Sequence, residues 1–142
     1  MTASTLFQAF TVIAFSGWIA LAIGIITKRD WLRDKLAGLW IPVLLSAAYA
    51  ALILLFFAKS EGGFDSLENV QKLFTNSFAA LAGWVHYLAF DLFIGARIAR
   101  ESAKLKLPRW PLFALLPLTF LFGPMGFLAF EIIKSTRKDE QS

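Results

Sequence analysis

One apolar stretch, GWVHYLAFDLFIGARIAR at residues 83–100, carries the side chains most able to do chemistry. Charged groups at the centre of a membrane helix cost about 2.5–3.5 kcal/mol on insertion scales and indicate function by default. Asp91 and His86 lie on either side of the centre of the stretch, each within about 5 Å of it at 1.5 Å per residue. Arg97 lies nearer one end, where its guanidinium can extend to the interface. Asp91 and His86 are therefore the candidate catalytic residues.

The spacing of these residues decides which of them can act together. Five residues turn a helix through roughly 140°, so His86 and Asp91 are predicted on different faces. Trp84 and Tyr87 share the face of Asp91, whereas Phe90 shares that of His86. Chemistry that uses both therefore needs one ligand spanning both faces, or a partner from another helix. The structural alternative is that Asp91 holds a neighbouring helix and His86 bonds to a carbonyl or hydroxyl.

The residue set does not favour a metal or a cofactor. There is no cysteine, which excludes disulfides and thiolate ligands, and a single histidine excludes bis-histidine haem within one chain. A carboxylate site could be assembled from Glu68, Asp91, Glu131 and His86, but no Glu-x-x-His pair supports it. Nucleophile-elbow, P-loop and Rossmann patterns are absent from the sequence. We expect no metal and no cofactor.

Four apolar segments are long enough to cross a bilayer, which takes about 20 helical residues. They run over residues 6–27, 37–58, 74–99 and 112–133, and the whole chain is 58% hydrophobic. The first segment is too long for the core of a cleaved signal peptide. The sequence therefore predicts an all-α polytopic membrane protein, a four-transmembrane-helix bundle forming a single membrane domain over residues 1–142.

The connection between the second and third spans is predicted to hold a short surface helix. A Gly-Gly pair at 62–63 breaks the chain, and Asp65 or Ser66 can cap a new helix. Leu67 and Val70 then recur at helical spacing, which is typical of an interfacial helix over residues 66–73. An ordinary loop with one helical turn is the alternative.

The fourth predicted span contains LLPLTFLFGPMGF, in which two prolines and two glycines interrupt an apolar helix. Pro117 and Pro124 each remove a backbone donor, and Gly123 and Gly126 add flexibility. Such breaks persist in membranes only where neighbouring helices, side chains or water satisfy the freed carbonyls. The kink is either a packing feature or part of a cavity beside the third span.

Basic residues lie beside the ends of the apolar runs. The segments 28–36 and 100–111 each hold four Lys or Arg, the segment 59–73 holds two, and the N-terminus holds none. This asymmetry predicts that the two more basic segments face the cytoplasm, so that both termini of the expected bacterial inner (cytoplasmic) membrane protein lie outside, although three basic residues in the tail at 134–138 argue against that orientation. The net charge of +4 then reflects topology, and nucleic-acid binding is not expected.

Two motifs carry a family resemblance. GWVHYLAFDLFIGARIA together with LTFLFGPMGFL resembles the abscisic-acid-deficient (neoxanthin synthase) family of small four-helix membrane proteins. SLENVQKLFTNSFAALAGW is similar to that family's lead into its third helix, and the resemblance covers most of residues 37–133. It implies carotenoid metabolism, since plant members are needed to convert violaxanthin, an epoxide, into the allenic neoxanthin. This chain lacks a plastid transit segment, which suits a bacterium and leaves the substrate open.

The resemblance also implies which residues matter. An epoxide-to-allene isomerisation needs an acid for the epoxide oxygen and a base for a vinylic proton, and Asp91 is the expected proton donor, with His86 as the second catalytic residue. A long xanthophyll matches the roughly 30 Å apolar core, and 15 Phe, 5 Trp and 2 Tyr can line its groove. The expected substrate-binding residues are Trp84, Tyr87, Phe90, Glu68, Asn76, Arg97 and Pro124.

Three functions stay open at this stage. The first is a cofactor-independent isomerase acting on a carotenoid or other isoprenoid. The second is a carotenoid-binding or assembly factor without chemistry of its own, and the third is a small transporter using Asp91 and His86 as a proton relay. The expected partners are membrane lipid and a carotenoid or other isoprenoid ligand, with a homo-oligomer as a further candidate.

Overall fold

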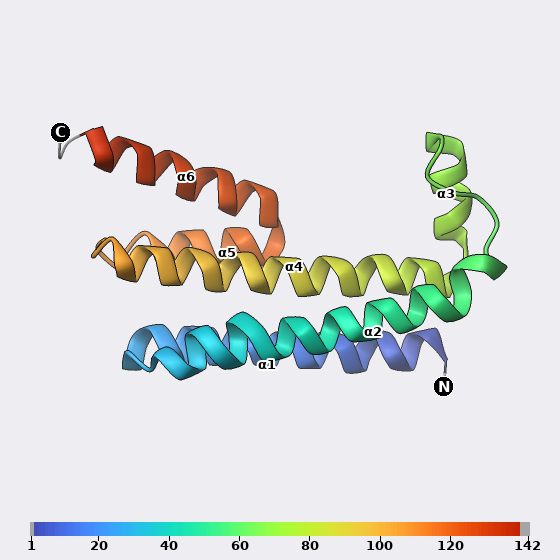
Figure 1. The fold of residues 1–142 in the computed structure, drawn as a ribbon, viewed down its shortest axis with the longest axis horizontal. Helices are drawn as coiled ribbons and strands as arrows, with labels where there is room; N and C mark the ends of the chain where they lie inside the picture. Colours follow the sequence, from blue (N-terminus) through green and yellow to red (C-terminus); the bar gives the residue numbers. More distant parts are fainter. Residues whose placement is uncertain (1, 140–142) are drawn as a thin grey trace.

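The structure is a computed structural model that describes residues 2–139, and every regular element in that range is helical. Three long helical runs lie side by side along the long axis, and a helical hairpin covers part of one of them (Figure 1). In chain order the elements are α1 (Ala3–Thr27), η1 (Trp31–Trp40), α2 (Ile41–Phe56), η2 (Phe57–Lys59), α3 (Leu67–Thr75), α4 (Ser77–Lys104), α5 (Leu112–Leu121) and α6 (Gly123–Asp139).

The three long runs are α1, the continuous run Trp31–Lys59 formed by η1, α2 and η2, and α4. Each is long and apolar enough to cross a membrane. They pack closely because small residues sit where the helices cross. A Cβ on Gly95 of α4 would lie 2.5 Å from the Trp18 ring of α1, and one on Gly17 would meet Leu92 and Ile41. Such small-residue contacts bring membrane helices together without a hydrophobic driving force.

The second run begins earlier than the predicted residue 37. Its first ten residues form a π-helix, and the Ile41 N–H at its end bonds to the Leu36 carbonyl five residues back. Charged residues enter this helix because they pair with one another: Arg33 Nε lies 2.7 Å from Asp34 Oδ1, and Arg100 Nε of α4 lies 3.9 Å from the same oxygen. Paired charges can extend a helix beyond its apolar segment.

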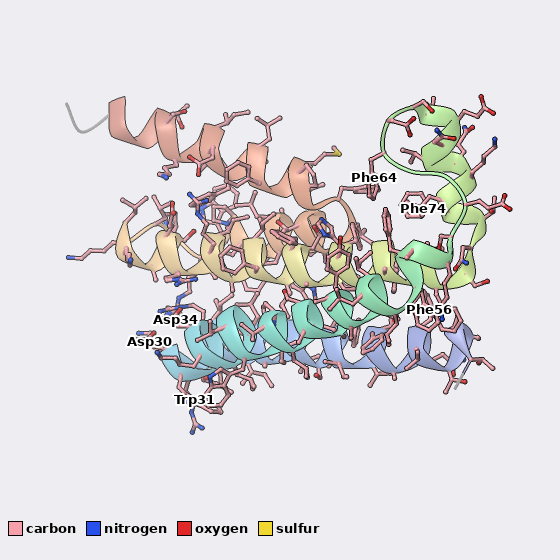
Figure 2. All side chains as sticks on the ribbon, turned by 45° about the vertical axis from the view of Figure 1, so that its right-hand side comes forward. Asp30, Trp31, Asp34, Phe56, Phe64 and Phe74 are labelled. Atoms are coloured by element: carbon pink, nitrogen blue, oxygen red, sulfur yellow. The ribbon has the colours of Figure 1, made fainter. Side chains whose placement is uncertain are left out.

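The predicted short helix before the third long run is present as α3. The Ser66 hydroxyl accepts a hydrogen bond from the Asn69 N–H at 3.2 Å, as an N-cap residue does. Gly62 holds φ +90°, and a Cβ there would overlap the Asn69 carbonyl, so the turn before α3 requires glycine. α3 projects from the end of the bundle (Figure 1). Phe64 and Phe74 lie at this end, and Asp30, Trp31 and Asp34 lie at the other (Figure 2).

The structure differs from the predicted fourth span. The segment breaks at Phe122, whose φ of −145° and ψ of 71° are not helical, and forms the antiparallel pair α5 and α6, here called the hairpin. The ten residues of α5 span about 15 Å, roughly half of an apolar core. A four-transmembrane-helix bundle is therefore not confirmed: within residues 2–139 there are three long runs and one hairpin.

The hairpin also changes where the chain ends. α6 returns to the end of the bundle where α4 finishes, and Lys134 Nζ of α6 lies 2.8 Å from Glu101 Oε2 of α4. The start of α1 lies at the opposite end (Figure 1). The hairpin thus turns back before it has run the length of the bundle (Figure 1). It places the start of the basic tail beside the two most basic connections.

Candidate functional site

The tip of the hairpin, residues 120–126, is where α5 ends and α6 begins. It meets α4 near the middle of that helix, and Asp91 lies at this contact. Asp91 is only 5% exposed in the 28-residue α4. Its carboxylate rests directly on Gly123, the first residue of α6: a Cβ there would lie 2.6 Å from Asp91 Cγ and closer still to Oδ1. Only glycine allows the hairpin to approach α4 this closely.

Tyr87 satisfies the carbonyl side of the break. One turn before Asp91, its hydroxyl donates to the Leu121 carbonyl at 2.7 Å and faces the Phe120 carbonyl at 3.0 Å. These carbonyls belong to the last turn of α5, where a helix leaves its carbonyls without intrahelical partners. In an apolar environment such groups need a donor from a neighbouring helix, which Tyr87 provides.

The N–H groups at the start of α6, on the other side of the break, also have hydrogen-bond partners. The Met125 and Gly126 N–H groups both bond to the Phe122 carbonyl, at 2.9 and 3.2 Å. Pro124 has no N–H, so the first turn of α6 presents one remaining amide, that of its first residue, and this amide faces the Asp91 carboxylate. A carboxylate at a helix N-terminus also meets the positive end of the helix dipole. Tyr87 and Asp91 together hold both halves of the broken helix.

One oxygen of Asp91 remains available after these contacts. Oδ2 is buried and has no hydrogen-bond partner in the part of the chain that the structure describes. Buried polar side-chain atoms are nearly always paired, so an unpaired one calls for an explanation. A ligand hydroxyl that donates to this oxygen would provide the missing partner.

Aromatic residues continue from this point along α4 towards α3. Trp84 stacks on Tyr87 with ring centroids 5.4 Å apart and on Phe7 of α1 at 5.3 Å, and its Nε1 donates to Thr11 Oγ1 at 3.0 Å. Beside it an open groove of about 420 Å³, here called the outer groove, is lined by Ala3, Ser4, Phe7, Ser77, Ala80, Leu81 and Trp84. The outer groove lies on the half of α4 that precedes the hairpin contacts.

His86 lies apart from this site. Its side chain is exposed on another face of α4, where it stacks on Phe90 at 4.8 Å and meets the edge of Tyr49 of α2 at 5.4 Å. The predicted separation of His86 and Asp91 is therefore what the structure has. Trp84, Tyr87 and Asp91 are brought together, and His86 and Phe90 form a separate pair.

The other predicted substrate-binding residues hold structural contacts. Glu68 is exposed on α3 and pairs with Lys72 at 3.3 Å. Asn76 caps α4, accepting from the N–H groups of its second and third residues at 2.9 and 3.2 Å. Arg97 pairs with Glu101 at 3.0 Å, and Pro124 is exposed in the first turn of α6. Only Pro124 of these lies at the hairpin tip.

Two hydrogen-bonding contacts of the site could not be predicted from the sequence. Thr11 of α1 fixes the Trp84 ring, and the carbonyls of Phe120 and Leu121 fix the Tyr87 hydroxyl. Both are tertiary contacts between distant segments, and only the FGPMG break signalled that carbonyls would need donors. Among the described residues no group of three His, Cys, Asp or Glu side chains could hold a metal ion.

Comparison with known proteins places the chain in a family. A search of curated proteins and a search of solved structures gave no significant match. The family model described as ABA DEFICIENT 4-like matches residues 5–130, a range that runs from α1 into α6 and includes the whole hairpin tip. The chain therefore belongs to the ABA DEFICIENT 4-like family, as its motifs predict, and this membership implies a role related to carotenoids or xanthophylls.

Proposed function

We propose that this protein is a cofactor-independent isomerase that acts on a carotenoid or related isoprenoid inside a bacterial cytoplasmic membrane. The observation that carries the proposal is the unpaired, buried Oδ2 of Asp91, held midway along α4 by the hairpin tip. The stacked rings of Trp84 and Tyr87 lie next to it and suit a flat, apolar end group.

The proposed reaction converts an epoxide into an allene and needs no redox partner. A vinylic carbon next to the epoxide loses a proton, the adjacent carbon–oxygen bond breaks, and the freed oxygen takes up a proton. Atoms and electrons balance, so the protein has only to move a proton. A side chain placed at the reacting oxygen can do this by general acid–base catalysis.

The position of His86 decides how many groups take part. Because His86 lies on another face of α4, beside Phe90 and Tyr49, we assign the proton transfer to Asp91 alone. Asp91 would take the vinylic proton as a carboxylate and return it to the freed oxygen. Tyr87 would position the end group through its ring while its hydroxyl stays on the α5 carbonyls.

The decisive experiment is expression in cells that supply violaxanthin, with chromatography of the membrane pigments. Conversion should be lost in Asp91→Asn and kept in His86→Gln. Glu61→Gln is the matched control, since it removes an exposed carboxylate from the segment before α3. Gel filtration and hydrogen exchange of the hairpin must show that Asp91→Asn is folded. Full conversion by a folded Asp91→Asn would refute the acid–base role.

A carotenoid-binding factor is the second candidate. The outer groove beside Trp84 is lined only by apolar and hydroxyl-bearing side chains among the described residues, which would suit holding a ligand without reaction. This function predicts an unchanged pigment pool, with carotenoid retained on the purified protein. Trp84→Ala would then release the pigment, whereas Asp91→Asn would retain it.

A further inference from the structure

A second cavity lies at the opposite end of the bundle from the outer groove. It has a volume of about 330 Å³ and lies where α1 and α4 end and α5 begins. Its charged lining residues are Lys28, Asp30, Arg33, Lys106 and Arg109. They come from two connections that are far apart in the sequence, so the fold gathers these charges into one basic cavity.

Most of the positive charge in the basic cavity is not neutralised by the protein. Arg33 is engaged by Asp30 at 2.9 Å and by Asp34 at 2.7 Å. Lys28, Lys106 and Arg109 form no ion pair with any described residue. Three free cationic groups around a small cavity are suited to an anionic group such as a phosphate.

The backbone conformation of Lys28 and Lys106 also supports an anion site in the basic cavity. Lys28 and Lys106 hold φ values of 57° and 53°, and they are the non-glycine residues with positive φ in the described range. Lys28 is the C-cap of α1, and Lys106 follows the end of α4; glycine is the usual residue in such left-handed positions. A lysine at each of these strained positions, lining one cavity, indicates a use for its side chain.

An apolar groove continues from the basic cavity along the membrane-facing side. It lies between α1 and α5, has a volume of about 470 Å³, and is lined by residues that include Phe15, Trp18, Phe113, Leu116 and Phe120. Ile25, Arg109 and Leu112 line both cavities, so the two are adjacent and are here together called the joined space. The joined space therefore has a basic head and an apolar tail.

Exposed tryptophans mark the level of the basic cavity. Trp31 is 52% exposed and Trp110 is 70% exposed, and both flank the connections that supply the cavity. Trp31 lies at this end of the bundle beside Asp30 and Asp34 (Figure 2). Tryptophan gathers at the boundary between headgroups and acyl chains, so the cavity lies where a lipid phosphate would be.

We propose that the joined space binds one anionic phospholipid from the surrounding bilayer. Its phosphate lies among Lys28, Lys106 and Arg109, and one acyl chain follows the groove between α1 and α5. Basic pockets between membrane helices are suited to such headgroups. The site is separate from Asp91, so the lipid would brace the hairpin from its open end whether or not the protein is an isomerase.

The test uses the full chain purified in a neutral detergent, with binding followed by native mass spectrometry. The probes are dioleoyl phosphatidylglycerol, dioleoyl phosphatidylcholine, farnesyl diphosphate and inorganic phosphate. Phosphatidylglycerol should bind one per chain and be retained over phosphatidylcholine. The double variant Lys106→Gln/Arg109→Gln should bind it about 30-fold more weakly. The matched control Arg29→Gln/Lys35→Gln removes the same charge from the same end of the bundle, outside the basic cavity, and should bind normally.

The remaining outcomes separate other sources of phosphate. Leu116→Trp narrows the apolar groove and should weaken phosphatidylglycerol binding while leaving all charges in place. Displacement of the lipid by inorganic phosphate would indicate a simple anion site, and stronger binding of farnesyl diphosphate would indicate an isoprenyl diphosphate site. Either result would overturn the proposal. So would equal losses in both double variants, because the lysines would then serve only helix capping and general surface charge.

Discussion

Replacing Tyr87 with phenylalanine should loosen the hairpin without disturbing the long helices. The change keeps the aromatic ring, and with it the stacking on Trp84 at 5.4 Å. It removes the hydroxyl that bonds to the Phe120 and Leu121 carbonyls at 3.0 and 2.7 Å. The last turn of α5 then has no side-chain donor among the described residues.

The size of the effect follows from the groups left unpaired. Hydrogen bonds between membrane helices average about 0.6 kcal/mol and reach about 1.7 kcal/mol. A buried carbonyl that loses its partner costs about 1–3 kcal/mol. One hydroxyl proton serves both carbonyls, so the two contacts count as one. Opening of the hairpin should become easier by about 1–3 kcal/mol, which makes the open form roughly 5- to 150-fold more populated.

Hydrogen exchange on the full chain in detergent or nanodiscs measures this opening. The amides of residues 122, 123, 125 and 126 should exchange roughly 5- to 150-fold faster in Tyr87→Phe than in wild type. The exchange of the α1 amides should be unchanged. Tyr49→Phe is the matched control. Tyr49 lies on neighbouring α2, meets the His86 ring edge-on, and its hydroxyl makes no hydrogen bond with described residues. Equal exchange in wild type and Tyr87→Phe, or an equal effect of Tyr49→Phe, would refute the reasoning.

Three further predictions concern the hairpin and its surroundings. Gly123→Ala places a Cβ against the Asp91 carboxylate and should lower stability by about 1–3 kcal/mol, measured by thermal unfolding in detergent. Asn76→Ala removes the N-cap of α4 and should cost about 1 kcal/mol with faster exchange of the first α4 turn. Because the chain has no cysteine, Ser135→Cys and Glu61→Cys can be labelled singly by an impermeant maleimide. They should be labelled from opposite sides of the membrane, and labelling from one side would exclude the hairpin.

The three long runs and the short surface helix could be predicted because their signals are local. Each long run depends on length and apolarity, which are properties of the segment itself. α3 depends on the Ser66 cap and on the glycines before it. The sequence places the start of the second run at residue 37 rather than at Trp31. Hydropathy alone does not show the pairing of Arg33 with Asp34, which allows charged residues in the helix.

The hairpin could not be predicted because its direction depends on distant contacts. Residues 112–133 have the length and apolarity of one full span, and the FGPMG motif indicates a break without saying which way the chain continues. The return is fixed by Tyr87 and by the pairing of Lys134 with Glu101, each across 33 residues or more. The separate faces of His86 and Asp91 were predictable from helix geometry alone. The burial of Asp91 under Gly123 was not, because it requires knowing where the hairpin turns.

The position of Asp91 allows its anchoring and catalytic roles to be separated. The Gly123 amide faces the carboxylate, Oδ1 is the oxygen nearer to the Cβ position of Gly123, and Oδ2 is unpaired. Asparagine keeps an acceptor for that amide but has no titratable proton. Asp91→Asn should therefore retain the hairpin and lose conversion. Alanine removes both functions, so Asp91→Ala should show faster exchange at residues 122–126 as well as lost conversion. If both variants are inactive and only the alanine variant is loosened, the carboxyl proton is needed for the reaction. If both are loosened alike, Asp91 acts chiefly as the N-terminal anchor of α6, and the loss of conversion would follow from the displaced hairpin.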